Sequence, residues 1–151
     1  MKYQFLLVLF LAVAIAASGC GGNVSTAILP TSTTGVKGAE DQTSLIATLQ
    51  AAGATVEVGD PITQPFFTPE GNVIKVNGVD VQVFEYESPE AMESEASQVA
   101  PDGGSIGTSM VSWMDTPHFH KAGRIIALYV GSNEAILRLL EKAIGPQFAG
   151  G

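Results

Sequence analysis

Residues 74–81 read Ile-Lys-Val-Asn-Gly-Val-Asp-Val and carry the strongest structural signal in the chain. Asn77-Gly78, at the centre, is the preferred pair for a two-residue type I′ turn between antiparallel strands. Such a turn pairs Ile74 with Val81, Lys75 with Asp80, and Val76 with Val79. Apolar side chains then share one face, and an opposite-charge pair lies on the other. The stretch therefore predicts a β-hairpin whose second strand continues through residues 83–86.

A helix start follows the hairpin. Ser88 is a preferred N-cap residue, Pro89 suits the first helical position, and Glu90 interacts favourably with the positive end of the helix dipole. We expect the helix to end at Pro101, because proline clashes with the preceding turn of a helix. Its outer face should be solvated and acidic, with Glu90, Glu93 and Glu95.

Two further strands and a last helix are expected downstream. Residues 107–114 fit one strand. Residues 124–130 fit another, which is apolar on both faces and therefore typical of a central strand covered on both sides. A helix should begin at residues 132–134, bury an apolar stripe and stop at Gly145-Pro146.

Upstream of the hairpin, apolar residues recur at helical spacing behind Asp41, and Gly53 follows as a stop. A first helix is therefore expected there. Residues 55–58 read as a short strand. Residues 60–71 read as a loop, because three prolines forbid a central strand.

These elements predict a single α+β domain over residues 41–149. We expect an antiparallel or mixed sheet of about five strands with three helices. Residues 81–101 also align with residues 125–145, strand on strand and helix on helix. This echo favours a strand–strand–helix pseudo-repeat and a two-fold pseudo-symmetric sandwich.

The first residues carry a targeting pattern. Lys2 precedes an apolar run over residues 5–17, and Ser18-Gly19-Cys20 follows. A basic start, a short apolar run and small residues are typical of a secretory signal peptide, here residues 1–19. The run is short for a membrane span.

The end of this segment, Ala17-Ser18-Gly19-Cys20, resembles the lipobox of bacterial lipoproteins, although Leu is usual where Ala17 stands. The resemblance implies that Cys20, the chain's single cysteine, becomes the lipidated first residue of the mature protein. It also implies export, with attachment to the bacterial cell membrane or outer membrane facing outside the cytoplasm. The alternative is an ordinary cleaved signal followed by an unmodified cysteine.

Composition limits the partners. Seven basic residues stand against fifteen acidic ones, which gives a formal net charge of −8. This balance argues against nucleic acid and against direct binding of anionic headgroups, so attachment must come from the lipid. Residues 20–40 are rich in Gly, Ser and Thr. We expect a lipidated cysteine on a flexible tether whose end-to-end distance is roughly 25 Å.

His118-Phe119-His120 is the one cluster of metal-ligand type. In an extended segment both imidazoles point the same way. With Asp115 they would suit Zn²⁺ or Cu²⁺, and Met114 would suit Cu⁺. The alternative is a surface pair, or one histidine capping the sheet edge. We expect the segment to be a turn between strands, where functional residues often lie.

Phe66 and Phe67 lie between two prolines. They could form an exposed aromatic surface that binds a partner, or their loop could pack its side chains into the hydrophobic core. Trp113 is expected in the core, with one partner for its N–H. No His-Glu-x-x-His or phosphate-loop motif is present in the sequence. Gly103-Gly104-Ser105-Ile106-Gly107 fits the Gly-x-Ser-x-Gly pattern in letters, but no strand precedes it as a nucleophile elbow requires, and we expect it to be a turn.

Residues 64–67, 81–86, 118–120 and 145–148 resemble small uncharacterised bacterial exported proteins, and the resemblance covers most of the domain. It implies no activity. We expect a non-catalytic binding module for a protein, peptide or small molecule, without a cofactor, at Phe66, Phe67, His118 and His120. The alternative is a metal-binding or metal-handling lipoprotein that uses His118 and His120 to hold Zn or Cu.

Overall fold

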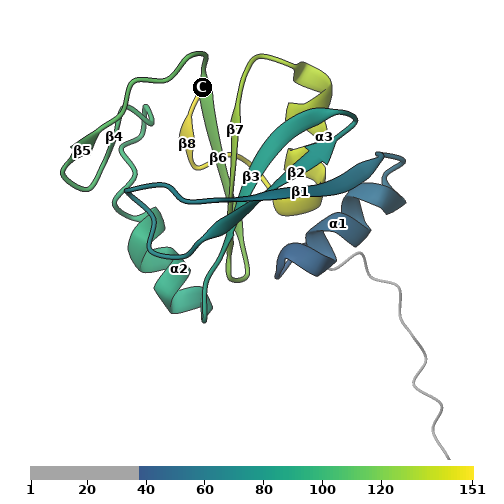
Figure 1. Ribbon diagram of the computed structural model, residues 1–151, viewed down its shortest axis with the longest axis horizontal. Coiled ribbons are helices and arrows are strands. Elements are labelled where there is room, and N and C mark those ends of the chain that lie inside the picture. The colour runs from purple at the N-terminus through teal and green to yellow at the C-terminus, as the bar shows by residue number, and fades with distance from the viewer. Residues whose placement is uncertain (1–37) are drawn as a thin grey trace, which may run out of the picture. The chain divides into compact units, whose positions relative to one another are not determined.

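The computed structural model describes residues 38–151, and its three helices and antiparallel strands confirm the α+β class (Figure 1). Its elements are α1 (Gln42–Ala51), β1 (Val56–Ile62), β2 (Gly71–Val76), β3 (Val79–Glu85), α2 (Pro89–Ala96), β4 (Ser105–Ile106), β5 (Ser109–Met110), β6 (Pro117–Ala122), β7 (Ile125–Val130), α3 (Glu134–Ile144) and β8 (Ala149–Gly150). The predicted signal peptide, Cys20 and the tether as far as residue 37 lie outside the described residues. Of the helices in residues 38–151, none has the length and apolar character needed to cross a membrane.

The main sheet has six strands in the order β1-β2-β3-β7-β6-β8, and every neighbouring pair is antiparallel. The β2–β3 hairpin has the predicted register, with Lys75 opposite Asp80. Their side chains form an ion pair of 2.6 Å. Asn77 and Gly78 both have positive φ, 51° and 80°, as a type I′ turn requires. The hairpin prediction is confirmed.

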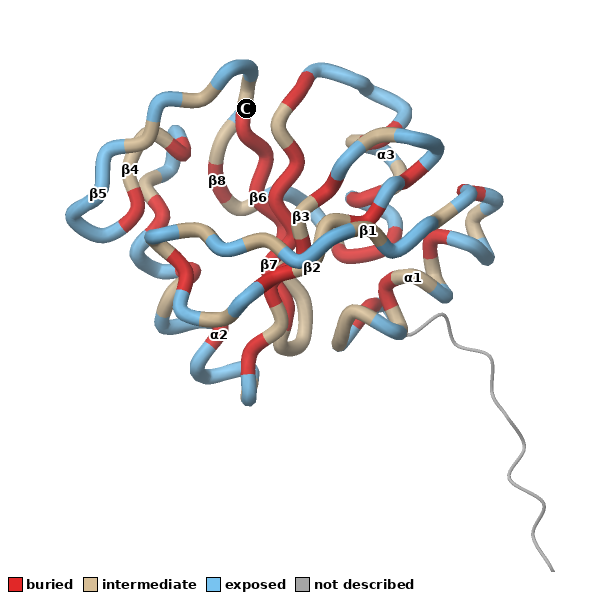
Figure 2. Tube along the Cα trace, viewed as in Figure 1, coloured by how far each residue is buried: buried red, intermediate tan, exposed pale blue. Residues whose placement is uncertain are grey.

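Strand β7 lies at the centre of the sheet between β3 and β6, as its apolar pattern predicted. Figure 2 shows how burial concentrates in β6 and β7. Successive side chains point to opposite faces, so Ile125, Ala127 and Tyr129 enter one core while Ile126 and Leu128 enter another.

We call the two sides of the sheet the α3 face and the α2 face. The α3 face is covered by α1 and α3, through Leu45, Leu49, Ile136 and Leu140. The α2 face is covered by α2, through Met92 and Ala96, and by the loops and the small β4–β5 sheet.

Local signals set the helix boundaries. Asp41 caps α1 by accepting from the Ser44 N–H at 2.8 Å, and Ser88 caps α2 by accepting from the Ala91 N–H at 3.2 Å. Gly145, at φ 115°, ends α3. All three predicted helix starts are confirmed.

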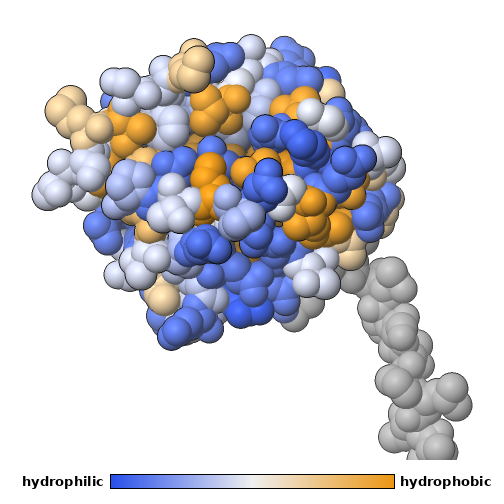
Figure 3. All heavy atoms as spheres, in the orientation of Figure 1, coloured by the Kyte–Doolittle hydropathy of each residue, from blue (hydrophilic) through white to orange (hydrophobic). Residues whose placement is uncertain are grey.

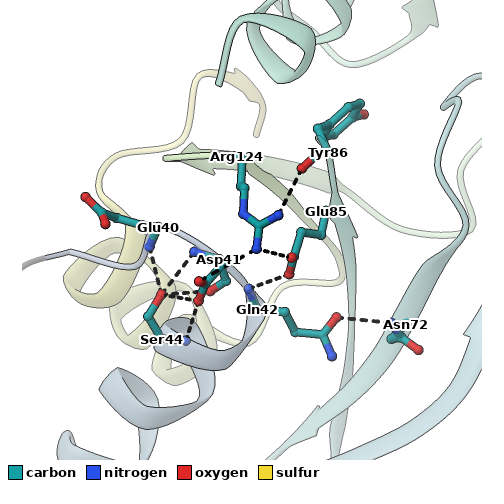
Figure 4. A network of polar contacts seen from close by, with 8 residues as sticks. All are labelled: Glu40, Asp41, Gln42, Ser44, Asn72, Glu85, Tyr86 and Arg124. Atoms are coloured by element: carbon teal, nitrogen blue, oxygen red, sulfur yellow. Dashed lines mark hydrogen bonds and ion pairs between the residues drawn. The ribbon is translucent and has the colours of Figure 1, made fainter. Parts of the chain in front are cut away.

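The start of the domain is fixed by contacts near its first described residues. Ala39 is buried, and its N–H donates to the Ala143 carbonyl at 3.0 Å. Arg124 pairs with Glu85 at 2.6 Å, and the Gln42 N–H donates to Glu85 at 2.9 Å (Figure 4). The chain therefore enters the fold beside β3 and the β6–β7 turn.

The pseudo-repeat holds in connectivity only. Strand–strand–helix occurs twice, as β2-β3-α2 and β6-β7-α3, and the order β2-β3-β7-β6 is symmetric. However, α2 packs on one face of the sheet and α3 on the other. A two-fold axis between antiparallel β3 and β7 would put both helices on one face, so the expected two-fold sandwich is wrong.

The expected loop at residues 60–71 begins too early. Strand β1 continues through Pro61 to Ile62, with a register shift between Val58 and Pro61. Proline is tolerated because β1 is an edge strand and its outer side needs no donor. Figure 3 shows small hydrophobic patches among hydrophilic residues on this side of the molecule, and Val58 is 60% exposed. The bulge, Pro61 and nearby acids discourage pairing with another chain.

The segment after α2 also differs. Helix α2 ends at Ala96, earlier than expected, because the backbone beyond it bonds elsewhere. The Ala100 N–H donates to the Ser105 carbonyl and the Gly107 N–H to the Gln98 carbonyl, each at 2.9 Å. The expected strand at 107–114 shrinks to β5, since Gly107 turns the chain at φ 56°.

The His118–His120 segment is not a turn. It lies within β6, and the turn falls at Gly123 and Arg124. Pro117 is the first residue of the strand, a position that proline tolerates. The alternation of His and Phe is a strand pattern, and the flanking proline and glycine obscured it.

Candidate functional site

The sheet separates the predicted site residues into two pairs. Phe66 and Phe67 pack on the α2 face, whereas His118 and His120 alternate with Phe119 and point to the α3 face. The four residues therefore do not form one site.

His118 is buried and holds two segments against β6. Its Nδ1 lies 2.7 Å from Gln147 Oε1, and its Nε2 lies 3.0 Å from the Gly131 carbonyl. The ring stacks on Tyr129, with centroids 5.9 Å apart. These contacts tie the chain end and the β7–α3 loop to the sheet.

His120 is 2% exposed, so the expectation of a surface pair is wrong. Its Nδ1 donates to the Gly145 carbonyl at 2.9 Å. Its Nε2 is buried and has no hydrogen-bond partner among residues 38–151. Burial lowers the pKa of His120 below its usual range, and the neighbouring His118 lowers it further, so the ring is neutral at pH 7.

The third residue of the alternative metal site does not join the histidines. Asp115 is exposed, and its carboxylate accepts from the Thr116 N–H at 2.7 Å. Across residues 38–151, no group of three or more His, Cys, Asp and Glu side chains could hold a metal ion. A closed protein site needs three or four ligands.

The two phenylalanines have different positions. Phe67 is buried against Phe84, with centroids 4.8 Å apart, and acts as a core plug. Phe66 is half-buried and packs edge-on against Trp113 at 5.9 Å. The Trp113 Nε1–H donates to the Gly103 carbonyl at 2.8 Å, which is the single partner predicted for it.

Two cavities adjoin on the α2 face, and we call them together the α2 groove. The first measures about 370 Å³ and is lined by Thr68, Pro69, Glu85, Tyr86, Glu87, Ala91 and Glu95. The second measures about 320 Å³ and is lined by Pro65, Phe66, Phe67, Thr68, Glu95, Gln98, Ile106, Gly107, Thr108 and Ser109. Thr68 and Glu95 belong to both walls.

Hydrogen bonds fix this shared wall. The Glu95 carboxylate accepts from the Thr68 N–H at 3.1 Å, from the Thr68 hydroxyl, and from the Tyr86 hydroxyl at 2.8 Å. Burial raises the pKa of Tyr86 far above its usual range, and the bond to Glu95 and its charge raise it further. Tyr86 is therefore a permanent donor, and Glu95 is anchored by neutral groups.

The charge in the groove is negative. Glu85 is neutralised by Arg124, but Glu87 has neither a hydrogen bond nor an ion pair within residues 38–151. Glu95 contacts only neutral donors. No basic residue lines either cavity.

Sequence reasoning found two groove residues, Phe66 and Phe67, and treated Glu95 as part of a solvated helix face. Thr68 and Glu95 are 27 residues apart, and no local pattern joins them. Tyr86 carried a weak signal, as an aromatic residue at the end of a buried strand.

Comparisons of the chain with protein-family models, with curated proteins and with solved structures find no match. The α2 groove is therefore interpreted from its own chemistry.

Proposed function

We propose that the chain is an exported lipoprotein, anchored through Cys20, whose domain is a non-catalytic module that binds a ligand in the α2 groove. One observation carries the binding role: two cavities meet at a single hydrogen-bonded wall, Thr68 with Glu95. Each cavity has the volume of a small-ligand site, about 300 to 1,000 Å³.

The groups that line the groove suit recognition. A catalytic acid or base must be able to exchange its proton near the working pH. Tyr86 keeps its proton because its pKa is raised, and Glu95 is held by three hydrogen bonds. Thr108 and Ser109 have no hydrogen-bonded base within residues 38–151, which a hydroxyl nucleophile would need.

The anchoring role is supported by the sequence pattern around Cys20, which lies outside the described residues. Fractionation tests it. Cys20→Ser should move the protein from the membrane to the soluble fraction or leave the precursor unprocessed. Ser25→Ala, in the same tether, should leave attachment unchanged. Membrane attachment and mature size that survive Cys20→Ser would remove the lipoprotein role.

The binding role can be tested by nitrogen–proton NMR with a mixture of small amines, carboxylates, aromatics and blocked peptides. We expect shifts at the amides of Thr68, Ala91 and Thr108. Ala91→Phe should abolish those in the first cavity, because Ala91 is exposed and its new ring would fill that space. Ligands that shift only residues outside the groove would contradict the proposal.

A second candidate function is metal handling at His118 and His120. The observation that favours it is the unpartnered Nε2 of His120, since a buried polar atom without a partner needs an explanation. Zn²⁺ and Cu²⁺ should then raise the melting temperature of the protein but not of His120→Ala. An unchanged melting temperature with both metals would discard this candidate.

A further inference from the structure

We propose that the occupant of the α2 groove is a short peptide segment of a partner protein, with a Lys or Arg side chain in the first cavity and its backbone along the second. This inference rests on the proposed binding role of the groove. It adds the chemistry and the kind of partner.

Charge complementarity favours a cation. Glu87 is unpaired and Glu95 contacts only neutral donors, so two carboxylate charges in the first cavity lack a counter-charge within residues 38–151. Since no lysine, arginine or histidine lines either cavity, nothing in the walls repels a positive group. A cation would compensate these two charges, although Glu87 is exposed and a pair with it contributes only modestly.

The wall of the first cavity favours a cation on an apolar stem. Pro69, Ala91 and the ring of Tyr86 supply apolar surface between the carboxylates. Lysine and arginine side chains bury their methylene stems along such surface and keep the charged head at polar groups. A bare inorganic cation would leave this surface uncovered.

The second cavity favours a peptide over a small amine. Its wall is mostly polar, with the amide of Gln98 and the hydroxyls of Thr108 and Ser109. The two hydroxyls have no hydrogen-bond partner within residues 38–151 and are free to bond to peptide N–H and C=O groups. Because the cavities share Thr68 and Glu95, one extended chain can contact both.

The chain contains its own reporter of binding. Trp113 is the single tryptophan, and it packs on Phe66, which lines the second cavity. A peptide in that cavity should change the fluorescence of Trp113. A ligand confined to the first cavity should change it little.

The test titrates the full mature chain, as Cys20→Ser, with three probes: the blocked peptide Ala-Ala-Lys-Ala-Ala, the same peptide with norleucine for lysine, and n-butylamine. The lysine peptide should bind most tightly. Norleucine keeps the stem without the charge, and butylamine keeps the charge without the backbone. Raising the ionic strength from about 0.01 M to about 0.15 M shortens the Debye length from about 30 Å to about 8 Å. The change should weaken the two charged probes, the lysine peptide and butylamine, and leave the norleucine peptide unchanged.

Variants assign the cation to the first cavity. Glu87→Gln should weaken the lysine peptide about two- to fivefold, as expected for one exposed charge pair. Glu57→Gln, on exposed β1 outside both cavities, removes the same charge and should change nothing. Ala91→Phe should abolish binding.

Four results would overturn the inference. Equal affinity for the lysine and norleucine peptides would show that the first cavity does not recognise a positive charge. Equal affinity for butylamine would assign the groove to small amines. If Lys37→Gln bound the lysine peptide more tightly than the unchanged protein, Lys37 of the chain's own tether would be the competing occupant of the groove. A preference of the groove for anionic or neutral ligands would contradict the proposed positively charged ligand but not the proposed binding role. The binding role itself fails only if no ligand binds in the groove.

Discussion

The two faces of the sheet are closed in different ways. On the α3 face, two helices pack side by side, and the eleven-residue α3 supplies a continuous apolar stripe. On the α2 face, an eight-residue helix covers part of the surface, and irregular segments and a two-stranded sheet cover the rest. The α2 groove lies on this second face. Incomplete coverage by regular elements leaves the space in which a ligand can bind.

The largest expected difference between the faces is the cost of truncating a core side chain. Leu140 of α3 is fully buried and Met92 of α2 is 5% exposed. We expect Leu140→Ala to lower the free energy of unfolding by about 3 to 5 kcal/mol and Met92→Ala by about 2 kcal/mol. The α2 face lies beside the two open cavities of the groove and can relax around a smaller side chain. Urea denaturation measures both, and an equal or larger loss for Met92→Ala would show that the α2 face is packed as tightly.

A matched pair of tyrosines gives the next effect. The Tyr86 hydroxyl donates to the Glu95 carboxylate at 2.8 Å on the α2 face, and the Tyr129 hydroxyl accepts from the Asn133 N–H at 3.0 Å on the α3 face. We expect Tyr86→Phe to cost about 1.5 to 3 kcal/mol and Tyr129→Phe about 0.5 to 1.5 kcal/mol, because bonds to charged groups are stronger.

Urea denaturation of Tyr86→Phe and Tyr129→Phe measures the two losses in the free energy of unfolding. The loss from Tyr86→Phe should also loosen the wall of the groove, visible as amide shifts at Thr68. Similar costs for the two variants would mean that the Glu95 bond does not organise the α2 face.

The faces also differ in how far local sequence determines them. The β2–β3 hairpin, the cap at Ser88 and the stop at Gly145 follow from neighbouring residues, and all were predicted correctly. The wrong predictions concern features that depend on where an element lies in the folded domain. Pro61 stays in a strand because β1 is an edge. No local pattern near that proline says where its strand will lie.

The candidate site shows the same limit. Phe66 was proposed from its loop, but the wall of the groove joins Thr68, Tyr86 and Glu95 from three elements. The histidines carried a strong chemical signal, yet the fold uses them to hold the chain end and the α3 cap, through Gln147 and Gly145. Residue type suggested chemistry, and only packing decides which side chains meet.

A smaller effect concerns pH on the α3 face. Burial lowers the pKa of His120, so in the folded state this ring binds a proton less readily than in the unfolded state, where the pKa is about 6.5. Its contribution to stability is therefore present above about pH 6.5 and is lost as pH falls through the lowered folded value.

The pH effect can be measured by urea unfolding in the presence of a chelator between about pH 7.5 and pH 5, the range around the histidine pKa. The wild-type protein should lose stability across this range more steeply than His120→Gln. Parallel curves for the two proteins would show that the ring is not the group that titrates.

The smallest expected effect involves no loss of stability and tests how closed the α2 face is. Met110 and Met114 are 92% and 103% exposed, whereas Met92 is buried in the core of that face. Hydrogen peroxide transfers one oxygen to a thioether to give the sulfoxide and water, so accessible methionines react first. We expect Met110 and Met114 to be oxidised well before Met92, and the melting temperature to hold until Met92 reacts. Mass spectrometry of proteolytic fragments over time measures the order. If Met92 reacts as fast as the exposed pair, the α2 face opens in solution, and the groove then forms only when a ligand closes it.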